Sequence, residues 1–83
     1  AMETIKASIH AGQLQVPLEM PISTKVILEL FDIKRKPVFV REYAVDKGSQ
    51  KIFFNIRHLV EGNYLLEISY DGKLIKKAVK ITN

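Results

Sequence analysis

The 83-residue sequence contains no cysteine and no tryptophan, and it has only three prolines and four glycines. Without cysteine the chain can form neither a disulfide scaffold nor a cysteine-ligated zinc finger. No apolar run approaches the ~18 residues of a membrane-spanning helix, and the N-terminal residues lack the basic start and apolar stretch of a signal peptide. A chain this short must therefore be held together by a hydrophobic core alone.

The composition is that of a small globular protein, with 47% hydrophobic and 27% charged residues. No repeat, low-complexity tract or Pro/Gly/Ser linker interrupts the sequence, so residues 1–83 are expected to form a single domain. Ala1 stands directly before Met2, and we expect these two residues to be an addition made for expression.

The sequence shows almost no helical periodicity, whereas short runs of β-branched and aromatic residues recur between turn residues. Apolar and polar residues alternate in most of these runs, which predicts strands with one buried face. Asp71-Gly72 is the strongest hairpin signal in the chain. The predicted strands are residues 3–9, 13–18, 24–32, 37–45, 51–56, 63–70 and 73–81. We therefore predict an all-β fold, a seven-stranded antiparallel immunoglobulin-like β-sandwich.

The positions of some strands within the sheets are also predicted. Pro17 cannot donate a ladder hydrogen bond, so the strand over 13–18 is expected either to lie at an edge or to end early. The strand over 24–32 has apolar residues on both faces and is predicted to be central. The strand over 37–45 has apolar residues on both faces as well, and its pattern leaves the inward face open.

The last predicted strand contains an interruption. Ile75, Val79 and Ile81 lie in phase with one another, but Lys77 occupies an apolar position of that pattern. This predicts either a β-bulge near Lys76-Lys77 or an exposed edge strand that lysine protects against aggregation.

A corner is predicted between the strands over 51–56 and 63–70. Leu59 would plug the end of the sandwich, and Gly62 would permit the tight turn. Tyr64 could bury its ring while its hydroxyl reaches back to the backbone, as in a tyrosine corner.

Catalytic signatures are missing from the sequence. The only histidines, His10 and His58, fall in predicted loops without the spacing of a metal site, and no serine stands in a G-x-S-x-G motif. No loop gathers the carboxylates that calcium requires, and no glycine-rich phosphate loop is present. We therefore predict a protein that is not an enzyme and that holds no metal or cofactor.

The net charge of +4 arises partly from two groups of basic residues. These groups could form a phosphate-binding surface for nucleic acid. Acidic residues are interspersed among them, however, and lysine on an edge strand commonly prevents aggregation, so nucleic acid is not the favoured partner. The two groups are Lys34-Arg35-Lys36 and the row Lys73, Lys76, Lys77 and Lys80.

Two aromatic residues are candidates for contact with a partner. Phe31 and Phe53 fall on the faces opposite the predicted core. They either cover a second layer or form an exposed apolar patch, and packing is the favoured alternative.

Several segments carry a family resemblance. Residues 59–68, followed by Asp71-Gly72 and by residues 76–80, resemble the pattern L-x-x-G-x-Y-x-L-x-I, D-G, K-K-x-V-K. This pattern is familiar from the C-terminal secretion-tail domains of the Por (type IX) system in Gram-negative bacteria, and from small secreted Ig-like proteins of unknown function. Residues 26–38 resemble the hairpin of these proteins, and residues 7–16 resemble the N-terminal pattern of the second group.

Two positions differ from the family pattern. Arg35 stands where the hairpin usually has glycine, so this turn must be of another type or Arg35 must adopt a positive φ. The Asn-Pro element that opens a secretion tail is replaced by Ile9-His10-Ala11, which favours the secreted group of unknown function.

The resemblance implies an exported protein that is secreted, periplasmic or attached to the cell surface. Our first interpretation is a noncatalytic Ig-like interaction or accessory module that binds a protein or cell-envelope partner and could form oligomers through an edge strand. The alternatives are a C-terminal sorting or adaptor tail of a secreted protein and a basic nucleic-acid-binding β-domain.

Overall fold

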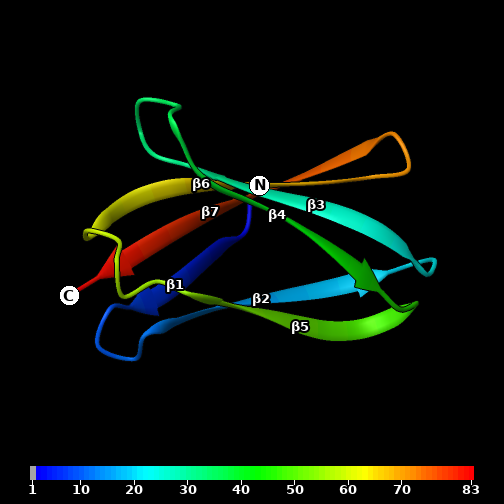
Figure 1. Ribbon diagram of the computed structural model, residues 1–83, viewed down its shortest axis with the longest axis horizontal. Coiled ribbons are helices and arrows are strands. Elements are labelled where there is room, and N and C mark those ends of the chain that lie inside the picture. Colours follow the sequence, from blue (N-terminus) through cyan, green and yellow to red (C-terminus); the bar gives the residue numbers. More distant parts are fainter. Residues whose placement is uncertain (1) are drawn as a thin grey trace.

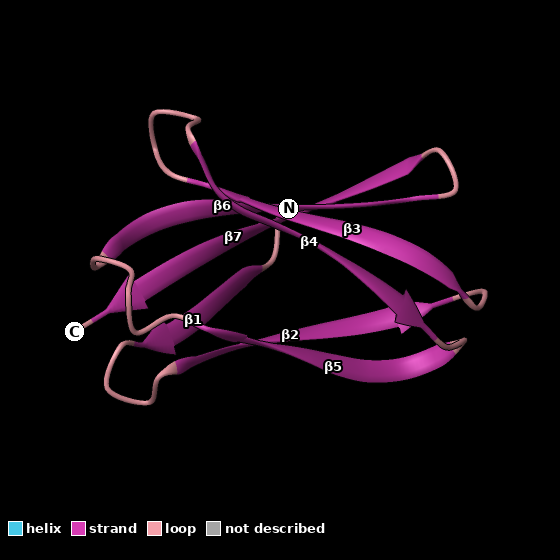
Figure 2. Cartoon of the chain, in the orientation of Figure 1, coloured by secondary structure: helices cyan, strands magenta, loops and turns pink. Residues whose placement is uncertain are grey.

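The computed structural model describes residues 2–83, and these residues form seven strands joined by short turns and no helix (Figure 1, Figure 2). Ala1, expected with Met2 to be an addition, lies outside the described residues. All seven predicted strands are present, which confirms the all-β prediction. They are β1 (Thr4–Ser8), β2 (Gln13–Met20), β3 (Thr24–Phe31), β4 (Pro37–Val45), β5 (Gly48–Asn55), β6 (Gly62–Tyr70) and β7 (Lys73–Thr82).

The strands form two sheets that pack face to face (Figure 1). The large sheet has the order β1-β7-β6-β3-β4, and the small sheet consists of β2 and β5. β2 therefore lies at an edge, as Pro17 predicts. β3 lies inside the large sheet, between β6 and β4, and β6 occupies the middle position.

One strand pair departs from the predicted antiparallel arrangement. β1 runs parallel to β7, with Thr4 opposite Ala78 and Ser8 opposite Thr82. The other pairs are antiparallel. Alternation along a strand records which face is buried but not the direction of its neighbour, and no hairpin turn joins the first strand to the last.

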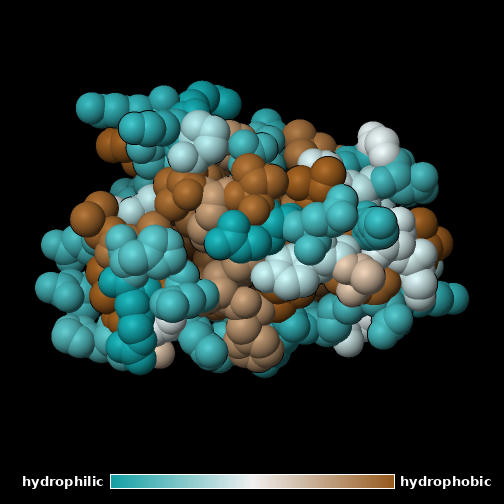
Figure 3. Space-filling model, viewed as in Figure 1, coloured by the Kyte–Doolittle hydropathy of each residue, from teal (hydrophilic) through white to brown (hydrophobic). Residues whose placement is uncertain are grey.

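The core lies between the two sheets and consists of apolar side chains. Within residues 2–83 no polar or charged residue is fully buried. Figure 3 shows apolar side chains gathered along the middle of the visible side, with hydrophilic residues around them. The buried residues include Leu14, Val16 and Leu18 of β2, Val26, Leu28 and Leu30 of β3, Ile52 and Phe54 of β5, Leu66 and Ile68 of β6, and Val79 and Ile81 of β7.

The inward face of β4, which its sequence leaves open, is decided by aromatic packing. Phe39 stacks on Phe54 of the small sheet with a centroid distance of 4.9 Å, and Tyr43 meets the same ring edge-on at 5.7 Å. Val40 consequently points outward and is 49% exposed. Aromatic rings reach across the space between the sheets, which the smaller Val40 cannot do.

Two turns explain how the strands reverse. Asp71 and Gly72 both have positive φ, 49° and 71°, and they connect the paired residues Tyr70 and Lys73 as the two-residue hairpin predicted. Arg35 has a φ of 63°, so the β3–β4 hairpin keeps the backbone geometry that usually requires glycine.

The β3–β4 turn is held by Asp32. Its carboxylate accepts hydrogen bonds from the backbone nitrogens of Lys34 and Lys36, at 2.8 and 2.9 Å. Its carbonyl accepts a third from Arg35 at 3.0 Å. These bonds hold Arg35 in its left-handed conformation.

Two strand limits differ from the prediction by more than one residue. β5 begins at Gly48 instead of residue 51, so Gly48 belongs to the strand and the turn before it is shorter. β2 continues past Pro17 to Met20, because an edge strand can accommodate a residue without an N–H.

Candidate interaction surface

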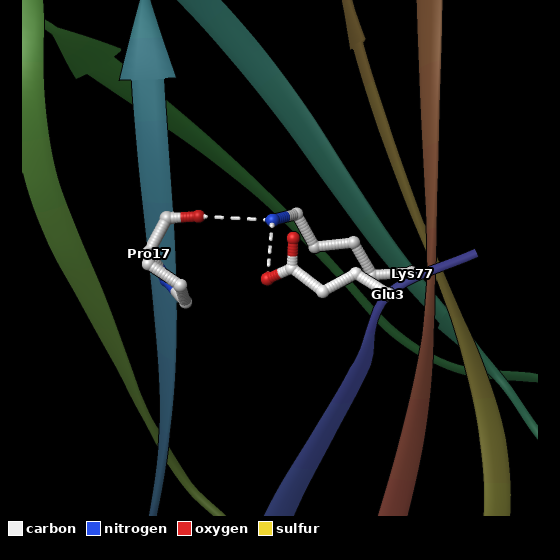
Figure 4. A network of polar contacts seen from close by, with 3 residues as sticks. All are labelled: Glu3, Pro17 and Lys77. Carbon is white, nitrogen blue, oxygen red and sulfur yellow. Dashed lines mark hydrogen bonds and ion pairs between the residues drawn. The ribbon is translucent and has the colours of Figure 1, made fainter. Parts of the chain in front are cut away.

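Lys77 is a charged residue whose position in β7 faces the interior of the sandwich. It lies opposite the fully buried Leu66 of β6, and its side chain is only 12% exposed. Its ammonium donates to the carbonyl oxygen of Pro17 at 3.3 Å and to Oε1 of Glu3 at 3.5 Å (Figure 4). The side chain thus bridges the large sheet to β2 beside β1.

Both predictions for Lys77 are wrong. The pairing of β6 with β7 runs without interruption from Gly62 and Ile81 to Tyr70 and Lys73, so no bulge is present. β7 lies between β1 and β6 and is not an edge strand. A lysine can occupy an inward position here because its aliphatic stem covers apolar surface while its ammonium reaches polar partners at the side of the sandwich.

The other three lysines of the predicted row remain exposed. Lys76 lies opposite Glu67 of β6, and Lys80 lies between Asn63 of β6 and Lys6 of β1. Lys73 follows the Asp71-Gly72 turn. The row is therefore divided: Lys77 points into the sandwich, and Lys76 has an acidic neighbour. A continuous phosphate-binding row of four lysines is not formed.

The two candidate aromatic residues lie on different sheets. Phe31 belongs to the large sheet, opposite Leu65 of β6, and is partly buried. Phe53 belongs to the small sheet, opposite Gln15, and is 50% exposed. Because each points away from the core, the rings lie on opposite outer faces and cannot form one patch.

The predicted corner brings Leu59, Gly62 and Tyr64 together. Leu59 is partly buried against the core, and its nitrogen donates to the carbonyl of Ile56 at 3.0 Å. Gly62 has a φ of 152° with open space at its Cβ position, so the backbone angle favours glycine there. The Tyr64 hydroxyl donates to the Val60 carbonyl at 2.6 Å, the geometry of a tyrosine corner.

The environment of Tyr64 alters its acidity. Burial raises the pKa of Tyr64 above 10.0, and the negative charge of Asp32 raises it further. The neutral hydroxyl is therefore favoured by the fold.

A groove that the sequence does not predict lies beside β1. It has a volume of about 520 Å³ and is lined by Glu3 and β1, by Ala11, by residues of the neighbouring β2 and by Lys51 of β5. Glu3 and Pro17, the two partners of Lys77, are among its lining residues, as is Ala11 of the turn after β1. Pro17, which marks β2 as an edge strand, is the one sequence signal for an open side at this place.

Signs of metal or catalytic chemistry are sparse in the described structure. His10 and His58 are both exposed, and residues 2–83 contain no group of three or more potential metal ligands. Those residues also include no helix that could cross a membrane.

Residues 10–82 match the secretion system C-terminal sorting domain. The chain belongs to this family. No curated protein matches the chain. The match spans β2 to β7, and β1 precedes it.

Membership of the sorting-domain family confirms the suspected similarity to Por secretion tails and indicates a secreted or exported bacterial protein. It also supports the second of our interpretations, a sorting tail, over the first, an accessory module. The absence of the Asn-Pro element, which taken alone favours the secreted group of unknown function, therefore does not separate this chain from the sorting domains. The family is defined by sorting and not by catalysis, which is consistent with a protein that is not an enzyme.

Proposed function

We propose that this chain is a sorting domain that directs an attached protein to the secretion machinery of a Gram-negative bacterium. The family match over residues 10–82 carries this proposal. The machinery is the implied partner, and it would recognise the domain from outside, because the interior is filled by apolar side chains.

The fold supports recognition of a folded module. The turns and the tyrosine corner hold the strands in fixed positions, so side chains on the outer faces keep a constant arrangement. A rigid surface loses little conformational entropy on binding. Phe53 and the exposed lysines Lys73, Lys76 and Lys80 stay predicted contacts within this proposal, whereas the partly buried Phe31 and the inward Lys77 are less accessible.

The proposal is tested by fusing the chain to the C-terminus of a fluorescent passenger that carries a signal peptide. The fusion is expressed in a bacterium with the type IX system and in a strain that lacks a component of it. We expect passenger on the cell surface or in the medium only in the first strain. Equal export from both strains, or retention in both, contradicts the proposal.

A pair of variants tests whether the folded domain is what is recognised. Leu28→Asp places a carboxylate at a fully buried position and should abolish folding and export together. Val60→Asp makes a similar change at a residue that is 74% exposed and should leave export unchanged. Export of the Leu28→Asp fusion at the wild-type level would show that the machinery reads an unfolded segment.

A further inference from the structure

The sandwich has four strand edges, β1 and β4 in the large sheet and β2 and β5 in the small one. An edge strand presents unpaired N–H and C=O groups, and another chain can add a strand by bonding to them. Which edge is open depends on what else occupies these groups.

Two of the edges are blocked near their middle. On β2, Pro17 has no N–H, and its carbonyl already accepts a hydrogen bond from Lys77 at 3.3 Å. On β4, the carbonyl of Val40 accepts a hydrogen bond from the guanidinium of Arg41 at 2.9 Å. That guanidinium lies 5.5 Å from the Phe39 ring centroid, which holds it in place. Each cation covers an oxygen that an added strand would need.

The edge of β1 is open. Glu3 and Ile9 bond to β7, the first through its carbonyl to Ala78 and the second through its nitrogen to Thr82, both at 2.9 Å. Because backbone groups alternate in direction along a strand, those of Thr4 and Lys6 point away from β7. Their N–H and C=O groups face the side where the groove lies.

The groove beside this edge is positively charged. Glu3, Lys6 and Lys51 are its charged lining residues. Glu3 is paired with Lys77 at 3.5 Å, which leaves Lys6 and Lys51 as the unpaired charges. Gln13 and Gln15 of β2 add uncharged polar groups on the opposite wall. An acidic side chain entering the groove would therefore meet favourable charge on both walls.

We propose that β1 is a docking strand, which binds an extended acidic segment of a partner protein as an additional strand of the large sheet. The backbone of Thr4 and Lys6 supplies the hydrogen bonds, and Lys6 and Lys51 select for acidic side chains. The family match begins at residue 10, so β1 itself lies outside the matched residues, whereas Lys51 and the β2 wall of the groove lie within them. The inference does not rest on the proposed sorting function.

The experiment uses the full isotope-labelled chain and an eight-residue peptide of alternating glutamate and valine. Amide shifts in the NMR spectrum report where the peptide binds and how tightly. We expect saturable shifts at Thr4, Lys6 and Ser8, and much weaker binding of a matched peptide of alternating lysine and valine. Shifts centred on β4 or β5, no shifts at millimolar peptide, or equal binding of both peptides would overturn the proposal.

A proline variant separates backbone pairing from charge. Lys6→Pro removes an N–H that the fold does not use and should weaken peptide binding at least about tenfold, since it also blocks the approach of the added strand. Lys6→Ala removes the charge but keeps the N–H and should weaken binding only about two- to threefold, as expected for one exposed charge. Equal affinity of the proline and alanine variants would show that no strand is added.

The proline variant must remain folded for this comparison. Its spectrum should keep the dispersed shifts of β6 and β7, because position 6 bonds to neither of them through its N–H. If Lys6→Pro fails to fold, the map of shifts on the wild-type chain still decides, since binding away from residues 4–8 refutes the docking strand.

Discussion

Replacing Lys77 separates the contribution of its aliphatic stem from that of its charge. Lys77→Ala removes three methylene groups from a side chain that is only 12% exposed. At about 0.8 kcal/mol for each buried methylene, we expect the free energy of unfolding to fall by about 2 kcal/mol. Lys77→Met keeps a stem of similar length and loses only the ammonium.

The charge itself should contribute little. Glu3 is 64% exposed, so water screens its attraction to Lys77, and Glu3→Gln should lower the free energy of unfolding by about 0.5 kcal/mol or less. Losing the hydrogen bond to Pro17 should lower the free energy of unfolding by about 1 kcal/mol. Part of this loss is offset in the methionine variant, because no ammonium has to be buried. We therefore expect Lys77→Met to cost less than about 1 kcal/mol.

Urea denaturation followed by circular dichroism measures these differences, with equal m-values as the check that the unfolded states are comparable. Glu3→Gln serves as the matched control, because it removes the ion pair and leaves the lysine stem in place. If Lys77→Met destabilises the protein as much as Lys77→Ala, the charge and not the stem holds this position, and our account of Lys77 is wrong.

Three further changes test the corner, the hairpin and the β4 edge. Tyr64→Phe should lower the free energy of unfolding by about 1 kcal/mol, because the hydroxyl loses its bond to Val60. Because the fold raises the pKa of Tyr64, the stability that its neutral hydroxyl contributes should be fully present below pH 10.0 and be lost as the pH rises further. Denaturation measured between pH 8 and 11 should therefore show a weaker pH dependence for Tyr64→Phe than for the wild type. Arg35→Gly should raise the free energy of unfolding by about 0.5–1 kcal/mol in the same assay, because glycine accepts a φ of 63° without strain, and a loss of stability would contradict this. Arg41→Ala should uncover the Val40 carbonyl and promote self-association, which sedimentation velocity measures and an unchanged sedimentation coefficient would refute.

Alternation in the sequence was sufficient to predict the buried face of most strands. Leu14, Val16 and Leu18 lie in phase, and all three are buried as expected. This works because a strand places successive side chains on opposite faces, so hydrophobicity with a period of two encodes burial directly. For β4 the same rule failed, since Phe39 and Val40 are neighbours of similar hydrophobicity and only the rings of the opposite sheet distinguish them.

Turn chemistry is equally local. Asp71-Gly72 forms the predicted two-residue hairpin because both residues tolerate positive φ. Asp32 compensates for an arginine at a glycine position through hydrogen bonds to residues no more than four positions away. The interaction site could not be predicted in this way. Both the division of the lysine row and the groove beside β1 depend on how strands distant in the sequence pack together.

The sequence by itself therefore determined the class of fold, the strands, the buried faces of most of them, the hairpin at Asp71-Gly72 and the resemblance to sorting domains. Only the tertiary structure decided that β1 pairs in parallel with β7, that β7 is an interior strand, and that Lys77 reaches across to Pro17. The physical reason is that alternation and turns are properties of neighbouring residues, whereas the partner of an edge strand is chosen by contacts between residues at opposite ends of the chain.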